Sequence, residues 1–335
     1  MIIKSKAYAR AALIGNPSDG YFGKTISFTF DNFSALVTLY ESPELEILPT
    51  RRDGSVFSSI DDLALDVQLF GYYGGIRLLK AAVKTFYDYT RTNGIVLDKR
   101  NFTIRYESCI PNLVGLAGSS AIITACYRAL MTFYGVTIPK PELANIIRDT
   151  EQNELGISAG LQDRVIQVYE GLVYMDFDKT LIERQGYGRY ELLDPAKLPP
   201  IYIAYRTDLS EISDVFHNNI KARFLAGDKT IVDAMKFWAG ITDEALQCLE
   251  NDNAKKLGAL MDANFDKRAS IYKLSEGNIR MVQAARACGA SAKFTGSGGA
   301  IIGVYKDEKM FEKLSLELDR ISVRVIKPNI TTPNN

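Results

Sequence analysis

The segment Pro111–Ala121 has the sequence PNLVGLAGSSA, in which two glycines and two serines directly precede an apolar helical pattern. A helix start exposes unpaired backbone N–H groups and the positive end of the helix dipole, and both attract phosphate. The lysine of the P-loop pattern GxxxxGK[ST] is absent from this segment. Two interpretations therefore fit equally well: a phosphate-binding loop built from backbone, or a tight turn in which Ser119 caps the helix.

The second candidate group is the carboxylate of Glu151, in the sequence TEQNELGISAGLQDR. A helix over residues 141–155 would align residues spaced four apart, namely Leu143, Ile147, Glu151 and Leu155. Glu151 would then lie on the apolar side, where an unpaired carboxylate is costly. A bound cation is one way to satisfy it, and Glu154 on the neighbouring face is a competing ligand.

Two later segments place polar groups beside glycines. Asp163 and Arg164 follow the flexible sequence GISAG, where they form either part of a site or a local ion pair in a surface loop. Between two strand-like pieces lies a run of four small residues, Gly296, Ser297, Gly298 and Gly299. That run is either a hairpin loop or an anion-binding nest of backbone N–H groups.

The fourth segment, ARAALIGNPSDGYFGKTIS, lies near the N-terminus and combines charged and amide side chains with three glycines. Its candidate side chains are Arg10, Asn16, Asp19 and Lys24. Asn-Pro-Ser-Asp-Gly is also a good turn sequence in any protein, so the segment alone does not establish a site.

Composition excludes several other kinds of chemistry. Lys and Arg together number 40, as do Asp and Glu, so no excess of charge indicates a nucleic-acid or membrane partner. His217 is the single histidine, which excludes a multi-histidine metal site. The four cysteines form no CxxC pair, and no apolar run reaches the roughly 18 residues that span a bilayer. We expect a cytoplasmic protein that works with carboxylates, backbone and basic side chains.

The elements that must position these groups are of mixed type. Strands are predicted over residues 2–9, 25–30, 35–40, 102–108, 171–177, 300–305 and 322–327. Another strand is predicted after the two prolines of KLPPIYIAYR (197–206), which suggests a domain boundary near 180–200. Helices are predicted over 119–134, 141–155, 213–225, 228–250 and, with breaks, 254–287. This order lacks a regular βα alternation and favours an α+β fold. The polar C-terminal sequence NITTPNN is expected to be frayed.

The four motifs together resemble those of the GHMP kinases, the superfamily of galactokinase, homoserine kinase, mevalonate kinase and phosphomevalonate kinase. The first motif is similar to ARxxLIGxxxD, the second to PxxxGLxGSSA and the third to KxTGxGGG, although GLAGSSA has one more alanine than the usual GLGSSA. Ala300 and Ile301 stand where more glycine or a cysteine is common. Within the superfamily, GNPSDGYFGKTISF, GYYGGIRLLKA and GISAGLQDRVIQVYEGLVYMDF are similar to segments of the glucuronokinases.

The resemblance implies ATP and Mg²⁺ as cofactors, with both glycine-rich loops around the phosphates. Implied phosphate-binding residues are Pro111, Gly115, Leu116, Ala117, Gly118, Ser119, Ser120, Ala121, Gly296, Ser297, Gly298 and Gly299. Ser120 and Glu151 are the implied magnesium ligands. Asp163 is the implied general base, and Arg10 lies near the transferred phosphate.

The implied substrate is a sugar acid, phosphorylated on its anomeric C1 hydroxyl, with D-glucuronate in first place. Asn16 and Asp19 would contact the sugar. Arg164, Arg77 and Lys24 are candidate partners of its carboxylate, and Arg164 ranks first because it adjoins Asp163. Another sugar 1-kinase, acting on galacturonate, a heptose phosphate or fucose, and a non-catalytic sugar-sensing relative are the alternatives. Oligomeric state is left open.

The implied fold is an α+β, two-domain GHMP kinase fold. Residues 1–185 would form the N-terminal ATP-binding domain, resembling ribosomal protein S5 domain 2, and residues 186–335 a ferredoxin-like C-terminal domain.

Overall fold

The computed structural model describes residues 1–50, 53, 59–60, 74–206 and 217–333. The chain divides into two compact units. The first comprises Met1–Ala9, Phe33–Ile110 and Ala117–Val168, and the second Arg10–Asn32, Pro111–Leu116 and Tyr169–Asn335. Two long strands, β1 (Ile2–Ile14) and β2 (Lys24–Ser42), therefore contribute residues to both units. The predicted division at residue 185 stays a prediction.

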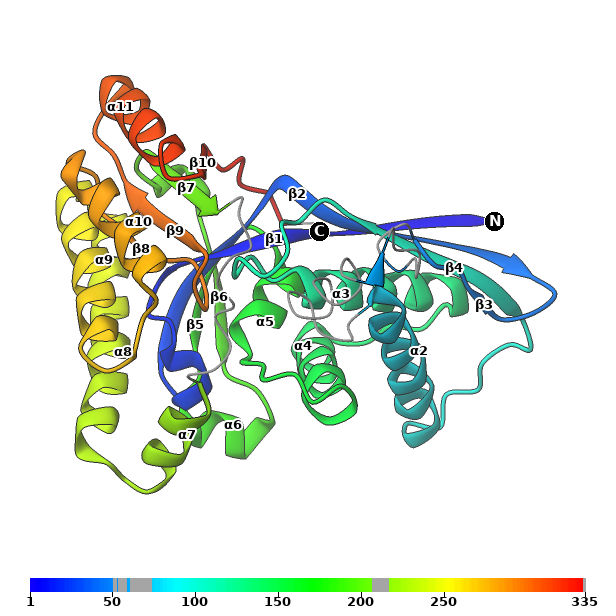
Figure 1. Cartoon of the computed structure of the whole chain (residues 1–335). Coiled ribbons are helices and arrows are strands. Elements are labelled where there is room, and N and C mark those ends of the chain that lie inside the picture. The colour runs from blue at the N-terminus through cyan, green and yellow to red at the C-terminus, as the bar shows by residue number, and fades with distance from the viewer. Residues whose placement is uncertain (51–52, 54–58, 61–73, 207–216, 334–335) are drawn as a thin grey trace. The chain divides into compact units, whose positions relative to one another are not determined.

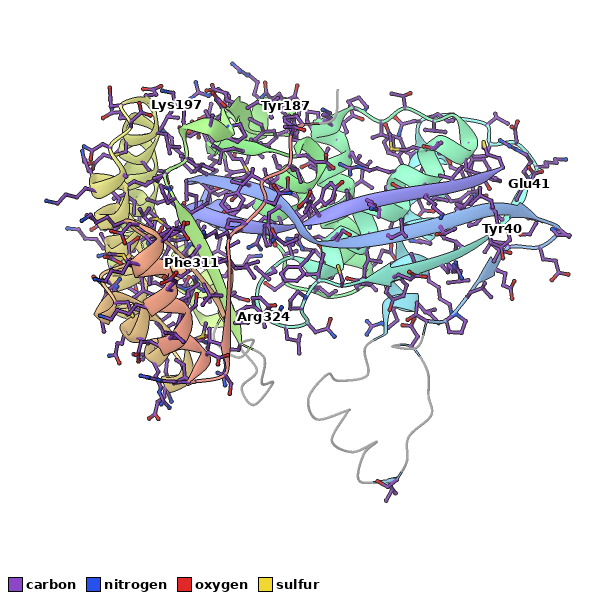
Figure 2. The ribbon with its side chains drawn as sticks, turned by 90° about the horizontal axis from the view of Figure 1, so that it is seen from above. Tyr40, Glu41, Tyr187, Lys197, Phe311 and Arg324 are labelled. Carbon is purple, nitrogen blue, oxygen red and sulfur yellow. The ribbon has the colours of Figure 1, made fainter. Side chains whose placement is uncertain are left out.

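In the first unit, the second half of β2 pairs with β4 (Asn101–Ser108) in an antiparallel ladder. The register places Ala35 opposite Ser108 and Ser42 opposite Asn101. The ladder ends beside Tyr40 and Glu41, where the chain turns towards the short strand β3 (Glu46–Ile47) (Figure 2). The strands predicted over 25–30 and 35–40 are thus two parts of one element.

The helices of the first unit are α2 (Gly75–Thr92), α3 (Gly118–Tyr134), α4 (Lys140–Asp149) and α5 (Gln162–Tyr169). α3 packs against β4, α2 and α4, which explains why its sequence is apolar on most sides (Figure 1). Gly135 ends α3 in the left-handed conformation, and Pro141 lies in the first turn of α4, both as predicted. After α4 the chain widens into a π-helical turn, Thr150–Glu154.

The second unit contains an antiparallel sheet in the order β10-β7-β9-β8. Its strands are β7 (Ile201–Arg206), β8 (Lys293–Phe294), β9 (Ala300–Val304) and β10 (Val323–Ile326). The helices beside it are α7 (His217–Leu225), α8 (Lys229–Glu250), α9 (Ala254–Ala269), α10 (Glu276–Ala287) and α11 (Glu308–Asp319). α9, α10 and α11 share one apolar core with the sheet, and in Figure 1 α8, α9 and α10 lie side by side.

Also in the second unit, the first half of β2 pairs antiparallel with β5 (Leu172–Asp176), and β5 pairs with β6 (Arg189–Leu193). A short helix, α6 (Lys179–Gln185), connects β5 to β6, and two 3₁₀ turns lie at Ser18–Tyr21 and Pro195–Lys197.

Hydrogen bonds hold residues 329–331 of the C-terminal segment, so the prediction of a frayed tail is wrong for that part. Thr331 N donates to Thr29 O at 3.0 Å, and the hydroxyls of the two residues lie 2.6 Å apart. Asn329 adds backbone and side-chain hydrogen bonds to Asp31. Threonine and asparagine side chains supply hydrogen-bonding groups that anchor a segment with little apolar surface.

Candidate active site

The glycine-rich segment enters α3 through a left-handed residue in the first unit. Ala117 has φ of 62° and precedes the first helical residue, Gly118. Gln167 fixes this corner, since its Nε2 donates to Ala117 O at 2.9 Å and to Tyr8 O at 3.1 Å. Among the residues that the structure describes, the first-turn amides of α3, those of Gly118, Ser119 and Ser120, find no acceptor. They are available to an anion.

Glu151 is fully buried, as its apolar stripe predicts. The Ser119 hydroxyl donates to its Oε1 at 2.7 Å, and two guanidinium nitrogens of Arg164 bind its Oε2. A buried arginine, whose side chain is 5% exposed, therefore satisfies the carboxylate that the sequence suggested a bound cation would satisfy. The predicted competitor, Glu154, instead binds Lys84.

The two serines of the motif take different roles. Ser119 is partly exposed, and its hydroxyl touches Glu151. Ser120 is fully buried, and its hydroxyl donates to Ala117 O at 3.2 Å within the helix start. The geometry thus associates Ser119, rather than Ser120, with the carboxylate.

Asp163 stands at the start of α5 with 18% of its side chain exposed. Nη1 of Arg164 lies 3.4 Å from its Oδ2 and donates to Gly160 O at 3.0 Å. The Arg164 guanidinium therefore lies between two carboxylates, one buried and one reaching solvent. This arrangement gives Asp163 a fixed cationic neighbour and leaves it accessible for proton transfer.

In the second unit the two predicted glycine loops touch each other. A Cβ at Gly115, whose φ is 68°, would lie 2.9 Å from Gly298 O, and one at Gly296 would lie 2.6 Å from Gly115 O. Residues with side chains could not come this close, so glycine at both places follows from the contact. The structure thus brings together two segments that are about 180 positions apart in the chain, as Gly115 and Gly296 show.

The Arg10 side chain binds Gly115 in one of these loops and Thr295, which directly precedes the other. It is 4% exposed, and its Nη1 donates to Gly115 O at 3.1 Å and to Thr295 O at 2.6 Å. Backbone hydrogen bonds reinforce the same junction, since Arg10 N donates to Leu116 O and Ala12 N to Thr295 O.

Two basic residues that sequence reasoning missed lie beside the second loop. Arg268 on α9 is 3% exposed, and it donates to Gly296 O at 2.8 Å and to Ser297 O at 3.2 Å. Lys293 is 1% exposed and donates to Ala12 O and Phe294 O, each at 2.8 Å. Burial, with Arg268 and Arg10 nearby, holds the pKa of Lys293 well below its usual value. Lys293 opens the KxTGxGGG-like motif, whereas Arg268 belongs to no recognisable pattern.

The N-terminal turn that contains Asn16 also contacts the 296–299 loop. Asn16 is 3% exposed, its Nδ2 lies 3.4 Å from Gly296 O, and its carbonyl accepts from Asn264. Asp19 lies in the 3₁₀ turn and is partly exposed.

Lys24 follows this turn, and its Nζ binds Asp243 at 2.7 Å. Partial burial lowers the pKa of Lys24, but the hydrogen bond to Asp243 and the nearby Tyr174 and Asp176 outweigh it, so the pKa lies above its usual value. Lys24 is therefore a cation at neutral pH.

Within the described ranges, no three His, Cys, Asp or Glu side chains gather to hold a metal ion. Magnesium does not need such a group, because it keeps water and phosphate oxygens in its octahedral shell. Of the helices that the structure describes, none is long and apolar enough to cross a membrane.

Comparison with known proteins gives two domain matches that fit this arrangement. Residues 77–171 match the GHMP kinases N-terminal domain, and residues 245–321 match the GHMP kinases C-terminal domain. The first contains the Ser119–Glu151–Asp163 group, and the second contains Arg268 and the 296–299 loop.

Curated relatives and a solved structure extend the likeness over nearly the whole chain. "Probable glucuronokinase 2" of Arabidopsis thaliana is 42% identical over 334 residues, 98% of this chain and 91% of the relative. "Glucuronokinase 1" of the same plant is 44% identical, over 90% of this chain and 84% of the relative. The Methanococcus jannaschii mevalonate kinase structure superposes with a TM-score of 0.71 at 20% identity, covering 99% of this chain and 98% of that one, which shows the fold. The chain therefore belongs to the GHMP kinases and has their two-domain α+β fold, as the resemblance predicted.

Proposed function

We propose that this kinase transfers the γ-phosphoryl group of ATP to the anomeric C1 hydroxyl of a sugar acid, with D-glucuronate as the substrate. The observation that carries the proposal is the 42–44% identity to two glucuronokinases over most of the chain. Asp163, Glu151 and the GSS serines, which a non-catalytic relative would be expected to lose, are all present.

Phosphate binding is assigned to backbone rather than to a lysine. The unpaired amides at the start of α3 supply hydrogen bonds and the positive end of a helix dipole. Gly115 and Ser119 belong to one continuous segment, Pro111–Ala121. Positioning and neutralisation of charge carry most of the catalysis in phosphoryl transfer.

The oxygen atoms of Ser119 and Glu151 fit a magnesium ion. A hydroxyl and a carboxylate oxygen 2.7 Å apart are hard ligands, and the phosphates and water would complete the shell. Ser120, the hydroxyl ligand expected from the family, is turned towards Ala117 O, so we assign the role to Ser119. When bound, Mg²⁺ would neutralise charge that develops on the phosphates.

We assign to Asp163 the role of accepting the proton of the sugar C1 hydroxyl. Its partly exposed carboxylate and fixed arginine neighbour suit a general base, a role that contributes about 10²–10⁴-fold to rate. Arg10 is buried against Gly115 O and Thr295 O, and we assign it to holding the two loops beside the transferred phosphate.

The substrate carboxylate needs a cation, and two of the three predicted candidates already bind protein carboxylates. Arg164 binds Glu151, and Lys24 binds Asp243. The Lys24 side chain is 26% exposed against 5% for Arg164, so Lys24 can exchange partners at lower cost. We rank Lys24 first and place Asn16 and Asp19 beside it on the same turn.

The test is a panel of sugars and sugar acids with ATP and Mg²⁺. We expect ADP release to depend on glucuronate and the product to carry phosphate on C1, as ³¹P NMR would show. Turnover stimulated by galacturonate, fucose or a heptose phosphate instead would keep the kinase and replace the substrate. No turnover with any sugar, together with unchanged ATP binding, would favour a sensing role.

A further inference from the structure

Two carbonyl groups of the 296–299 loop accept hydrogen bonds from Arg268, a residue outside every motif. Arg268 reaches from α9 and binds Gly296 O with Nη1 and Ser297 O with Nη2. The rings of Tyr272 and Phe294 lie 5.2 Å from its guanidinium carbon and fix the plane of the group. The guanidinium group of Arg268 is thus fixed in place, and its two terminal nitrogens bind the carbonyl groups of successive residues.

Holding the carbonyls sets the direction of the neighbouring amides. The N–H groups of Gly296, Ser297 and Gly298 donate to none of the residues that the structure describes. On the far side of the loop, Asn278 Oδ1 accepts from Gly299 N at 2.9 Å. The loop therefore has three successive backbone donors without an acceptor among the described residues, as an anion-binding nest requires.

Arg268 is 3% exposed, and no carboxylate of the described residues lies within ion-pair distance of its guanidinium. Burial lowers its pKa, and the negative charge of Asp19 offsets this effect only in part, yet an arginine keeps its proton. A buried cation without a directly bonded counter-ion is costly, and a bound anion would reduce that cost.

We propose that Arg268 is a positioning residue that shapes the 296–299 loop into a nest for the ATP phosphates and supplies part of the positive field around them. The inference rests on the proposed use of ATP but not on the identity of the sugar. A lysine at this position would keep the positive charge but lose the planar pair of donors that binds both carbonyl groups. The Lys substitution therefore separates the effect of geometry from the effect of charge.

The experiment compares Arg268→Lys and Arg268→Met with the parent chain in two measurements. Calorimetry gives the affinity for tripolyphosphate and for ATP, and steady-state kinetics give the KM for each substrate. We expect ATP affinity to fall roughly tenfold in the Lys variant and further in the Met variant. The KM of the sugar acid should change much less.

Arg100→Lys is the matched control. Arg100 also donates to a backbone carbonyl, that of Phe133, and lies 4.6 Å from an aromatic ring, but it belongs to the first unit. It should lose stability without losing tripolyphosphate affinity. If Arg268→Met does not fold, Asn278→Asp replaces it, because that change keeps the acceptor for Gly299 N and adds a negative charge that should weaken tripolyphosphate binding.

Two results would overturn the inference. The first is unchanged binding of tripolyphosphate and ATP: in Arg268→Lys it would show that the loop needs no fixed nest, and in Asn278→Asp that the phosphates do not bind at this loop. The second is a larger change in the KM of the sugar acid than in that of ATP, which would place Arg268 on the sugar side, through its electrostatic interaction with Asp19. ATP binding that depends on Arg268 in a chain that leaves glucuronate unphosphorylated would support the inference and reject the proposed substrate alone.

Discussion

At the scale of single residues, the chain buries ionic groups and satisfies them with protein partners. For Glu151 the burial could be predicted from the sequence: the spacing of its apolar neighbours predicts burial, and the side chain is fully buried. The partner was not predictable, because the π-helical turn after Asp149 shifts the register and α5 brings Arg164 to the carboxylate.

Replacing Arg164 by Met tests this buried pair. We expect a loss of about 3–5 kcal/mol in the free energy of unfolding, because Glu151 would remain buried without its cation. Urea denaturation measures the loss, and Arg164→Met combined with Glu151→Gln should restore much of it. Arg148→Met, which removes a more exposed pair with Asp149, is the control and should cost less than about 1 kcal/mol. Equal losses in both variants would contradict the argument.

Separate substitutions of the two serines distinguish their roles. Ser119→Ala removes the hydroxyl that touches Glu151, and we expect the Mg²⁺ concentration for half-maximal activity to rise several-fold with little change in melting temperature. Ser120→Ala removes a bond to Ala117 O inside the helix start, so it should lower stability by about 1 kcal/mol and leave the magnesium requirement unchanged. The reverse pattern would return the metal role to Ser120.

Asp163→Asn tests the proposed general base. The amide keeps the size of the side chain but cannot accept the proton of the C1 hydroxyl, so kcat should fall by about 10²-fold or more. Calorimetry should find ATP binding close to that of the parent chain, because Asp163 is separate from the amides of the helix start. Near-normal turnover in this variant would remove Asp163 from the mechanism.

At the scale of elements, contact between the glycine loops is what would assemble the proposed phosphate site in the second unit. Gly296→Ala would place a methyl group 2.6 Å from Gly115 O and 2.9 Å from an Arg10 nitrogen. We expect the loops to separate, with a lower melting temperature and weaker ATP binding. Gly240→Ala in α8 is the matched control, because nothing lies within 4 Å of its added methyl and alanine favours the helix. Equal behaviour of the two variants would show that the contact has no consequence.

The sequence predicted elements with strong local patterns better than it predicted contacts. β4, α3 and α8 lie close to their predicted ranges, because period and terminal residues define them locally. α2 and α11 were not predicted, although α11 begins with an Asp307 cap that could have marked it. The role of Arg268 could not be predicted from one sequence, because the helical pattern around it is the same as the pattern around an arginine on a protein surface.

At the scale of the whole molecule, anion binding must arise locally, because 40 basic and 40 acidic residues leave no net charge. A ligand that binds the folded chain alone raises its stability, by about 2.7 kcal/mol at 100 times its Kd. For a chain of this size we expect ADP with Mg²⁺ to raise the melting temperature by roughly 3–5 °C, and removal of Mg²⁺ by EDTA to reverse most of the shift. Asp163→Asn should show the same shift, since it preserves the phosphate-binding groups. A shift with glucuronate and none with nucleotide would contradict the assignment of the two glycine loops to ATP.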